Sequence, residues 1–448
     1  MKASPPKSFL LRAKGHTSQI IRCSVKDQLV QILMVKVVLF FERSVAASPL
    51  WDALSQVLSH YPTFAGSLKK VDGTLYIDCN NQGLKASVVQ RDVPLEQILQ
   101  RLFIDEEDKL IENLNPKKML TKGSPISSIR ISYFADGTMC MGLCWNHSVG
   151  DMHTLLCLLN AWSKTIHKEA FEPPMLLEDT DDYLKKQLKK SYAEHDSLHY
   201  ATVRELLSIA LYLLLKARKK KVLRFYFSQD ELVEMKRVFA EKSNKKLSTN
   251  DVLSAHFLSH VAKADPKKRH RYLGIVANYR SRLGLPAMLL GNHISSINLL
   301  CESEQDTIKL AERLRIALEN FAEEHADFWN IERLVASLGS RKKLSRCVAA
   351  GIDPTSGNLV ITNWSNFGVY DLEFGAGNPI YFSNLGSFIL PWISDFVEGP
   401  EQQGIMATIC LPEDIAHRML QKESLASLHQ YKISSDTHPL IEQLHNIF

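Results

Sequence analysis

The chain has 448 residues, of which 45% are hydrophobic and 23% charged, and its formal net charge is +5. These values are typical of a globular protein of about two or three domains, and the small charge argues against a dedicated nucleic-acid binder. The 8 cysteines include no C-x-x-C pair, so we expect reduced thiols rather than a disulfide framework. The first residues lack the apolar run of a signal peptide, and we expect a cytoplasmic protein.

Strand and helix signals alternate along the first part of the chain. Residues 28–44 are rich in Val, Ile and Phe and predict one or more strands. Ser48-Pro49 has the residue types of an N-cap and a first-turn proline. The apolar spacing that follows predicts an amphipathic helix over 49–60. Asp72-Gly73 and Asp136-Gly137 each lie between strand-like flanks, which predicts two hairpins.

The stretch CWNHSVGDMHT, residues 144–154, places His147 where a predicted strand ends and Asp151 where a predicted helix begins. Catalytic groups are often found at such junctions. From the residues alone, His147 has three interpretations: a locally hydrogen-bonded structural histidine, a metal ligand or a general base. The spacing by itself favours the structural one. A neutral imidazole accepts protons near physiological pH, and Gly150 permits the tight turn that a base at this place needs.

A metal site around His147 would need ligands such as His153, Cys140 or Cys144. The two cysteines fall four residues apart on a predicted strand, which puts them on one face but far from each other. No second compact pair completes a ligand set, and we expect no metal.

Residues 172–222 read as a surface linker, with a proline pair, an acidic patch and a lysine-rich stretch. Its apolar run, 206–215, leads into the basic sequence KARKKK. That run is shorter than the roughly 20 residues of a membrane span. We favour a buried or interface helix. The alternative is weak contact with a membrane surface through 203–221.

The second half again alternates strands and helices. A strand is predicted at 222–227, and a capping box of Ser228 and Glu231 opens a helix after it. Ser248 with Asp251 predicts a second helix start. A longer helix is expected near 306–323, followed by strands and a helix from residue 412. The pattern predicts an α/β chain with mixed (α+β) sheets in two halves: domains at 1–175 and 223–448, joined by a crossover linker at 176–222.

Several segments in fixed order then carry a resemblance to a known family. They are LSHYPTFAGSL (58–68), LYIDCNNQGLKASV (75–88), NHSVGDMHTLLCLLNAWSK (146–164), STNDVLSAH (248–256), NYRSRL (278–283), LGNHI (290–294) and NLVITNWSNFGVYDLEFGAG (358–377). Together they resemble the BAHD acyltransferases, which are acyl-CoA-dependent enzymes with H-x-x-x-D and D-F-G-W-G motifs. The likeness extends over nearly the whole chain and leans toward the hydroxycinnamoyltransferase-like branch.

The resemblance implies two domains, each built like chloramphenicol acetyltransferase, with a channel between them. It implies a monomer that takes acyl-CoA as co-substrate, holds no permanent cofactor and acylates a hydroxyl or amine of a small molecule. His147 matches the family's general base, which works without a covalent enzyme intermediate. Asp151 matches the second motif residue, whose role is structural and whose partner is an arginine, here Arg280 or Arg282.

Further residues follow from the same resemblance. Thr362 and Trp364 match acceptor-side positions, with a core aromatic as the alternative for Trp364. Ser248 and Thr249 match positions near CoA. The basic cluster at 267–271 reads as a surface turn, with attraction of CoA phosphates as the alternative.

The chain departs from the family in three places. The D-F-G-W-G motif reads EFGAG, in which Glu373, Gly375 and Gly377 are expected to support the channel and Glu373 to reach an arginine. Met152 replaces a glycine, which implies a looser helix start or a narrower channel. Thr355 stands where the hydroxycinnamoyltransferase-like branch tends to carry an arginine, so a carboxylate-bearing acceptor lacks its usual cation.

Two rival functions remain open. A condensation-type acyltransferase would use a carrier-protein-bound donor, but those enzymes carry a second histidine where this chain has Asn146. A non-catalytic binding protein on a degenerate acyltransferase fold is suggested by EFGAG and opposed by the intact His147 and Asp151.

Overall fold

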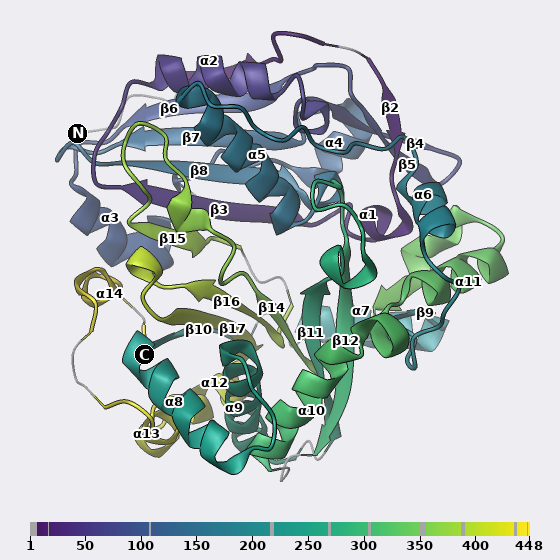
Figure 1. The fold of residues 1–448 in the computed structure, drawn as a ribbon, viewed down its shortest axis with the longest axis vertical. Helices are drawn as coiled ribbons and strands as arrows, with labels where there is room; N and C mark the ends of the chain where they lie inside the picture. Colours follow the sequence, from purple (N-terminus) through teal and green to yellow (C-terminus); the bar gives the residue numbers. More distant parts are fainter. Residues whose placement is uncertain are drawn as a thin grey trace.

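Two mixed six-stranded sheets form the framework of the chain (Figure 1). The computed structural model describes residues 7–16, 18–106, 109–215, 219–267, 270–302, 306–349, 355–386, 390–433, 437–445 and 447–448. The first sheet has the order β1 (Lys7–Leu11), β6 (Leu84–Gln90), β7 (Ser127–Tyr133), β8 (Met139–Asn146), β3 (Met34–Phe41) and β15 (Tyr381–Asn384). The second has the order β10 (Lys220–Phe227), β17 (Ile405–Pro412), β16 (Ile393–Glu398), β14 (Leu359–Asn363), β11 (His270–Asn278) and β12 (Ile294–Glu302).

Smaller elements complete the description. A small sheet joins β2 (Ile20–Arg22), β5 (Thr74–Asp78) and β4 (Ser67–Val71), and a two-stranded ribbon pairs β13 (Cys347–Ala349) with β9 (Leu198–Tyr200). The helices are α1 (Val25–Leu29), α2 (Ala47–Val57), α3 (Leu95–Arg101), α4 (Pro116–Lys122), α5 (Met152–Ile166), α6 (Thr180–Gln187), α7 (Val203–Leu215), α8 (Gln229–Lys242), α9 (Thr249–Ala264), α10 (Thr307–Glu319), α11 (Phe328–Leu338), α12 (Glu413–Met419), α13 (Lys422–Leu428) and α14 (Pro439–Gln443).

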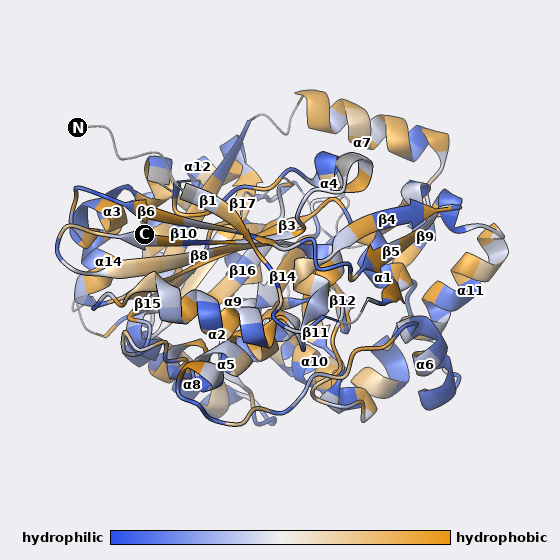
Figure 2. Cartoon of the chain, turned by 90° about the horizontal axis from the view of Figure 1, so that it is seen from above, coloured by the Kyte–Doolittle hydropathy of each residue, from blue (hydrophilic) through white to orange (hydrophobic). Residues whose placement is uncertain are grey.

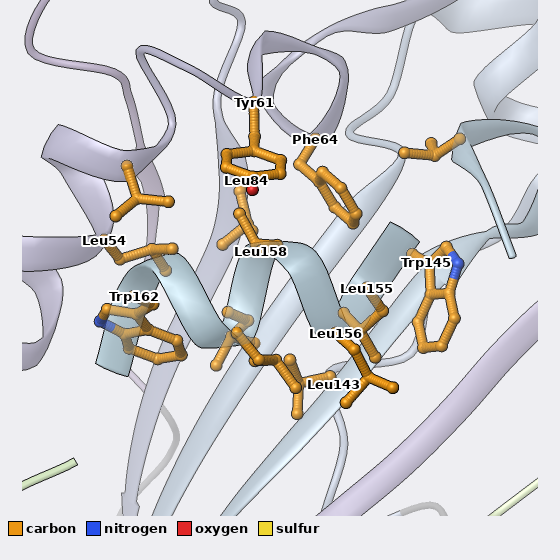
Figure 3. Packing of buried hydrophobic residues seen from close by; sticks show 14 of the residues in the cluster. Leu54, Tyr61, Phe64, Leu84, Leu143, Trp145, Leu155, Leu156, Leu158 and Trp162 are labelled. Atoms are coloured by element: carbon orange, nitrogen blue, oxygen red, sulfur yellow. The ribbon is translucent and has the colours of Figure 1, made fainter. Parts of the chain in front are cut away.

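The core of the first half lies between its sheet and the helices α2 and α5. Helix α5 buries ten of its residues, and Figure 3 shows Leu155, Leu158 and Trp162 along it, facing Leu54 and Tyr61. The indole of Trp162 donates to the Leu50 carbonyl at 2.9 Å. This packing fixes α5 against the sheet, and its N-terminal end is therefore a rigid support for whatever precedes it.

A separate core forms the second half, where α9 lies buried against its sheet. The two halves also exchange chain. Strand β15 pairs antiparallel with β3 of the first sheet, and the segment from Val369 to Ala376 contributes buried residues to the first core. In Figure 1 the purple and blue half and the teal to yellow half lie one above the other, joined by these crossings.

Local turn chemistry was predicted correctly at several places. Asp72-Gly73 joins β4 to β5 with both residues at positive φ, and Gly137 has φ +82° in the turn from β7 to β8. Ser248 and Asp251 form a reciprocal capping box on α9. Ser228 caps α8 by accepting from the Glu231 amide, but the reciprocal bond is not made, because the Glu231 carboxylate faces His429.

One helix prediction and one strand prediction need correction. The helix predicted over 49–60 is α2, which begins at Ala47 after Ala46, a residue without a side-chain cap, so Pro49 lies inside the first turn. The run predicted as strand over 28–44 contains the end of α1 before β3 begins. Helix α1 begins with a capping box, in which the side chains of Ser24 and Asp27 each accept a hydrogen bond from the other residue's backbone amide.

The segment 176–222 is structured in its described part. It carries α6, β9 and α7, and β9 pairs with β13 far along the chain. The apolar run is not buried in the chain's own core, since α7 buries none of its residues; an interface helix stays a prediction. Residues 216–218 of the basic stretch, and 268–269 of the basic cluster at 267–271, lie outside the described residues. In the part of the chain that is described, no helix is both long and apolar enough to cross a membrane.

Candidate active site

His147 lies at the end of β8, in the short turn that leads into α5. The turn is a single 3₁₀ turn, His147–Val149, followed by Gly150 and by Asp151 as the N-cap of α5. Gly150 has φ +156°, and a Cβ there would come within 2.5 Å of the Thr154 side chain. Only glycine therefore permits this turn, as the sequence predicted.

Backbone hydrogen bonds hold His147 from two sides. Its amide donates to the Leu33 carbonyl at 2.9 Å, and its carbonyl accepts from the Asn292 side chain at 2.8 Å. The side chain is half-buried, and its buried Nδ1 has no hydrogen-bond partner among the described residues. The local hydrogen bonds of His147 are thus made by its backbone, and none is made by its Nδ1 within the described part of the chain.

Asn146, which stands where condensation-type enzymes carry a second histidine, is fully buried. Its Oδ1 accepts from the Ser148 amide at 2.9 Å, and its Nδ2 donates to the Gln31 carbonyl at 2.8 Å. Asn146 thus shapes the turn and is committed to backbone groups on both ends of its amide.

Asp27 and Asn292 support the turn from outside the motif. The Asp27 carboxylate accepts from the Asn292 side chain at 2.7 Å and from its amide at 3.2 Å, and the Ser148 hydroxyl donates to the Asp27 carbonyl at 2.8 Å. Burial raises the pKa of Asp27. Asn292 lies in the LGNHI segment, which the sequence pointed to without assigning a role. Asp27 was not identified from the sequence.

Asp151 forms a buried ion pair with Arg280. Arg280 Nη1 lies 2.8 Å from one carboxylate oxygen of Asp151, and Nη2 lies 3.2 Å from the other. The amides of Thr154 and His293 each donate to the carboxylate at 3.0 Å. Burial alone raises a carboxyl pKa, but the Arg280 charge outweighs it here and lowers the pKa of Asp151 to about 2. The lowered pKa keeps the Asp151 carboxylate ionised near neutral pH, paired with Arg280.

Arg280, and not Arg282, is the arginine partner. Arg280 is 2% exposed and also donates to the carbonyls of Leu289 and Gly291, at 2.8 and 3.0 Å. Arg282 is exposed and lies on a short 3₁₀ turn beside the Phe321 ring. The pair ties the first half of the chain to the segment between β11 and β12.

A cavity of about 680 Å³ opens beside this segment in the second half. Ser248 and Thr249, at the N-terminus of α9, line it together with Arg282. Arg315 lines the cavity too and donates through Nε to the buried Asp251 carboxylate at 2.8 Å. Lys236 adds a third cationic side chain. Ser248 and Thr249 therefore line one cavity with three cationic side chains, of which Arg315 and Lys236 were not identified from the sequence.

Another wall of the same cavity is formed by Asn363, Ser365, Asn366 and Phe367, whereas Thr362 and Trp364 are not among its lining residues. Thr362 is on β14, in register with Val276 of β11 and Asp395 of β16. The Asn363 amide group donates to the Asn250 side chain at 2.7 Å, which joins β14 to the start of α9. Trp364 is half-buried against the first core, so it is packed on one face and open on the other.

The EFGAG segment lies at the opposite end of α5 from His147. The Glu373 carbonyl accepts from the Ser163 hydroxyl at 2.6 Å, and Phe374 packs on the Trp162 ring. Gly375 and Gly377 both have φ +82°. The expectation that Glu373 reaches an arginine is wrong: its carboxylate pairs with His167 and accepts from the Gly377 amide at 2.8 Å. His167 is close because α5 ends beside the motif.

Met152, where the family carries a glycine, is the first residue of α5 and is buried. The helix start is firmly capped by Asp151, so the looser start is not observed. Among the described residues, no cluster of three or more His, Cys, Asp or Glu side chains is arranged to hold a metal ion.

Known proteins resemble this chain over most of its length. The model of the Transferase family matches residues 7–424. Epi-neemfruitin B synthase of Melia azedarach is 23% identical over 437 residues, which cover 91% of this chain and 93% of that protein. The structure of vinorine synthase superposes with a TM-score of 0.70 at 20% identity, covering 95% of this chain and 98% of the other.

The structure of F. graminearum TRI101 complexed with coenzyme A and T-2 mycotoxin has a TM-score of 0.72 at 17% identity, covering 91% of this chain and 98% of that one. At such identities, likeness to a solved structure demonstrates a shared fold. The predicted mixed α/β, chloramphenicol-acetyltransferase-like fold is confirmed.

Proposed function

The chain belongs to the Transferase family, that of the BAHD acyltransferases, and on this premise we propose that it transfers an acyl group from acyl-CoA to a hydroxyl or amine of a small molecule. The substrate classes are supported by F. graminearum TRI101, whose structure was solved with coenzyme A and T-2 mycotoxin. The domains at 1–175 and 223–448, with the channel between them, are part of this proposal.

His147 is the proposed general base. Its neutral imidazole takes the proton from the acceptor, which attacks the thioester carbonyl and forms a tetrahedral intermediate. The C–S bond then breaks, CoA leaves as the thiolate, and His147 returns the proton to it. No nucleophile of the enzyme is needed, so no covalent enzyme intermediate forms. The observation that supports the proposal is the His147 backbone held by hydrogen bonds on both sides, with a half-buried side chain whose Nδ1 has no partner among the described residues.

The acyl-CoA is proposed to enter through the 680 Å³ cavity. Ser248 and Thr249 would face the pantetheine arm, and the cations around them would attract its phosphates. Thr362 and Trp364 would face the acceptor, where a hydroxyl donor to the developing oxyanion is worth about 3 kcal/mol in the transition state.

The proposal is tested by release of CoA, read with a thiol reagent, from a panel of acyl-CoAs offered with alcohols and amines. Wild type is expected to release CoA with at least one donor and acceptor pair, and mass spectrometry should find the acylated acceptor. If no pair in a broad panel releases CoA, the non-catalytic binding function replaces the acyltransferase.

Arg282→Ala is expected to raise KM for acyl-CoA roughly tenfold with little change in kcat, because a charged hydrogen bond to phosphate contributes about 1.5–3 kcal/mol. Steady-state kinetics with varied acyl-CoA measure the effect. Arg333→Ala is the matched control, since that arginine is exposed and pairs with Asp196 elsewhere on the surface. An unchanged KM in the Arg282 variant would show that the phosphates of CoA do not bind at this wall of the cavity.

A further inference from the structure

Helix α7 exposes a continuous apolar surface. None of its residues is buried, and Val203, Leu207, Leu211, Leu214 and Leu215 are each 57–65% exposed. Figure 2 shows α7 at the edge of the molecule, mostly in the hydrophobic colour. A contiguous apolar surface of this kind indicates an interaction site, whereas single exposed apolar residues do not.

The exposed residues recur at intervals of three, four and one along α7, which places them along one side of the helix. Its inner side is only partly packed: Leu206, Ile209 and Tyr212 are half-buried. Tyr212 also lines a cavity of about 800 Å³, shared with Trp392. The helix therefore rests on the body along a narrow inner strip and leaves its outer side uncovered by the described residues.

Cationic side chains stand at both ends of this apolar side. Arg204 is exposed in the first turn, and Lys219 is exposed beyond the last turn, where it lines the same cavity as Leu215. Lys220 and Lys221 belong to β10 and are half-buried, and Lys221 Nζ lies 2.6 Å from His417 Nε2, so the flanking cations are Arg204 and Lys219. The helix has one acid, Glu205, whose carboxylate caps its own N-terminus by accepting from the Thr202 amide at 2.7 Å. An apolar side flanked by cations complements a bilayer with anionic headgroups.

We propose that α7 docks on an anionic lipid bilayer, with its leucines toward the acyl chains and its flanking cations toward the headgroups. Its 13 residues are about 20 Å long, too short to cross a hydrocarbon core of about 30 Å. A second copy is the weaker fit, because one 13-residue helix supplies only a small part of the ~800 Å² per partner that a stable interface buries.

The test is sedimentation of the full chain with lipid vesicles. Wild type is expected to sediment with vesicles containing about one-third phosphatidylserine and to bind phosphatidylcholine vesicles weakly, and added salt should reduce the binding. The triple variant Leu207→Glu, Leu211→Glu, Leu214→Glu is expected to bind at least roughly tenfold more weakly, because its apolar side is lost.

A matched control places the same three charges elsewhere. Ile104→Glu, Leu300→Glu and Ile433→Glu replace apolar residues that are 47–70% exposed on other parts of the surface, and this variant should bind like wild type. Thermal unfolding midpoints establish that both variants fold. Wild type that stays in the supernatant with both vesicle types, or a control that loses binding equally, overturns the proposal. So does a concentration-dependent dimer that the α7 variant abolishes while no protein binds vesicles.

Discussion

Replacing His147 with alanine is expected to lower kcat at least ~10²-fold, since general-base catalysis contributes about that much or more. The side chain is half-buried, and its Nδ1 has no hydrogen-bond partner among the described residues, so its removal leaves no described Nδ1 partner unpaired. The thermal unfolding midpoint should therefore stay near that of wild type while activity is lost. Single-turnover release of CoA with the best donor and acceptor pair measures the chemical step directly.

His153→Ala is the matched control for this variant. His153 lies six residues further on, in the first turn of α5, and makes a hydrogen bond of 2.8 Å with the Ala287 carbonyl. Its loss should leave kcat within roughly tenfold of wild type, because the group is not at the proposed reacting centre. Equal losses in both variants would mean that the turn as a whole, and not the His147 imidazole, supports activity.

What the sequence predicted well depends on residues close together in the chain. Asp72-Gly73, Ser248 with Asp251, and the turn at Gly150 each impose a local backbone geometry, and the structure shows each of them. Such features are set by φ preferences and caps, which a single sequence contains.

What the sequence missed depends on residues far apart. Arg280 and Arg282 are two positions apart, and by residue type either could pair with Asp151. In the fold Arg280 is buried and Arg282 is exposed, and only the buried arginine reaches the carboxylate. The His167 partner of Glu373 follows from where α5 ends. The joining of β15 to the first sheet has no local signal either, since its partner strand β3 lies more than 300 residues earlier.

The exposure of α7 was not predicted either, for a different reason. Its composition matches a buried helix, and burial is the usual fate of such a run. No periodicity distinguishes a helix buried in the chain's own core from one that meets another apolar surface. The basic residues that follow the run, KARKKK, were the sequence feature that favoured contact with a membrane surface over burial in the core.

Asp151→Asn is expected to destabilise the fold by about 3–5 kcal/mol, because it leaves the buried Arg280 charge without its counter-ion. Both side chains are at most 5% exposed, so water does not replace the lost partner. The free energy of unfolding in urea measures the effect. Asp182→Asn breaks an exposed pair with Lys186 and serves as the control, with an expected change below about 1 kcal/mol.

The pH dependence separates the ion pair from a simple packing role. The pKa of Asp151 is lowered to about 2, against about 3.9 in an unfolded chain. Its contribution is therefore fully present above pH ~4 and is lost as the pH falls toward 2. The stability difference between wild type and Asp151→Asn should shrink over that interval. A difference that stays constant from neutral pH down to pH ~2 would show that the carboxylate charge does not account for it. Because asparagine keeps an N-cap acceptor, the loss would then lie in the packing and geometry of the site.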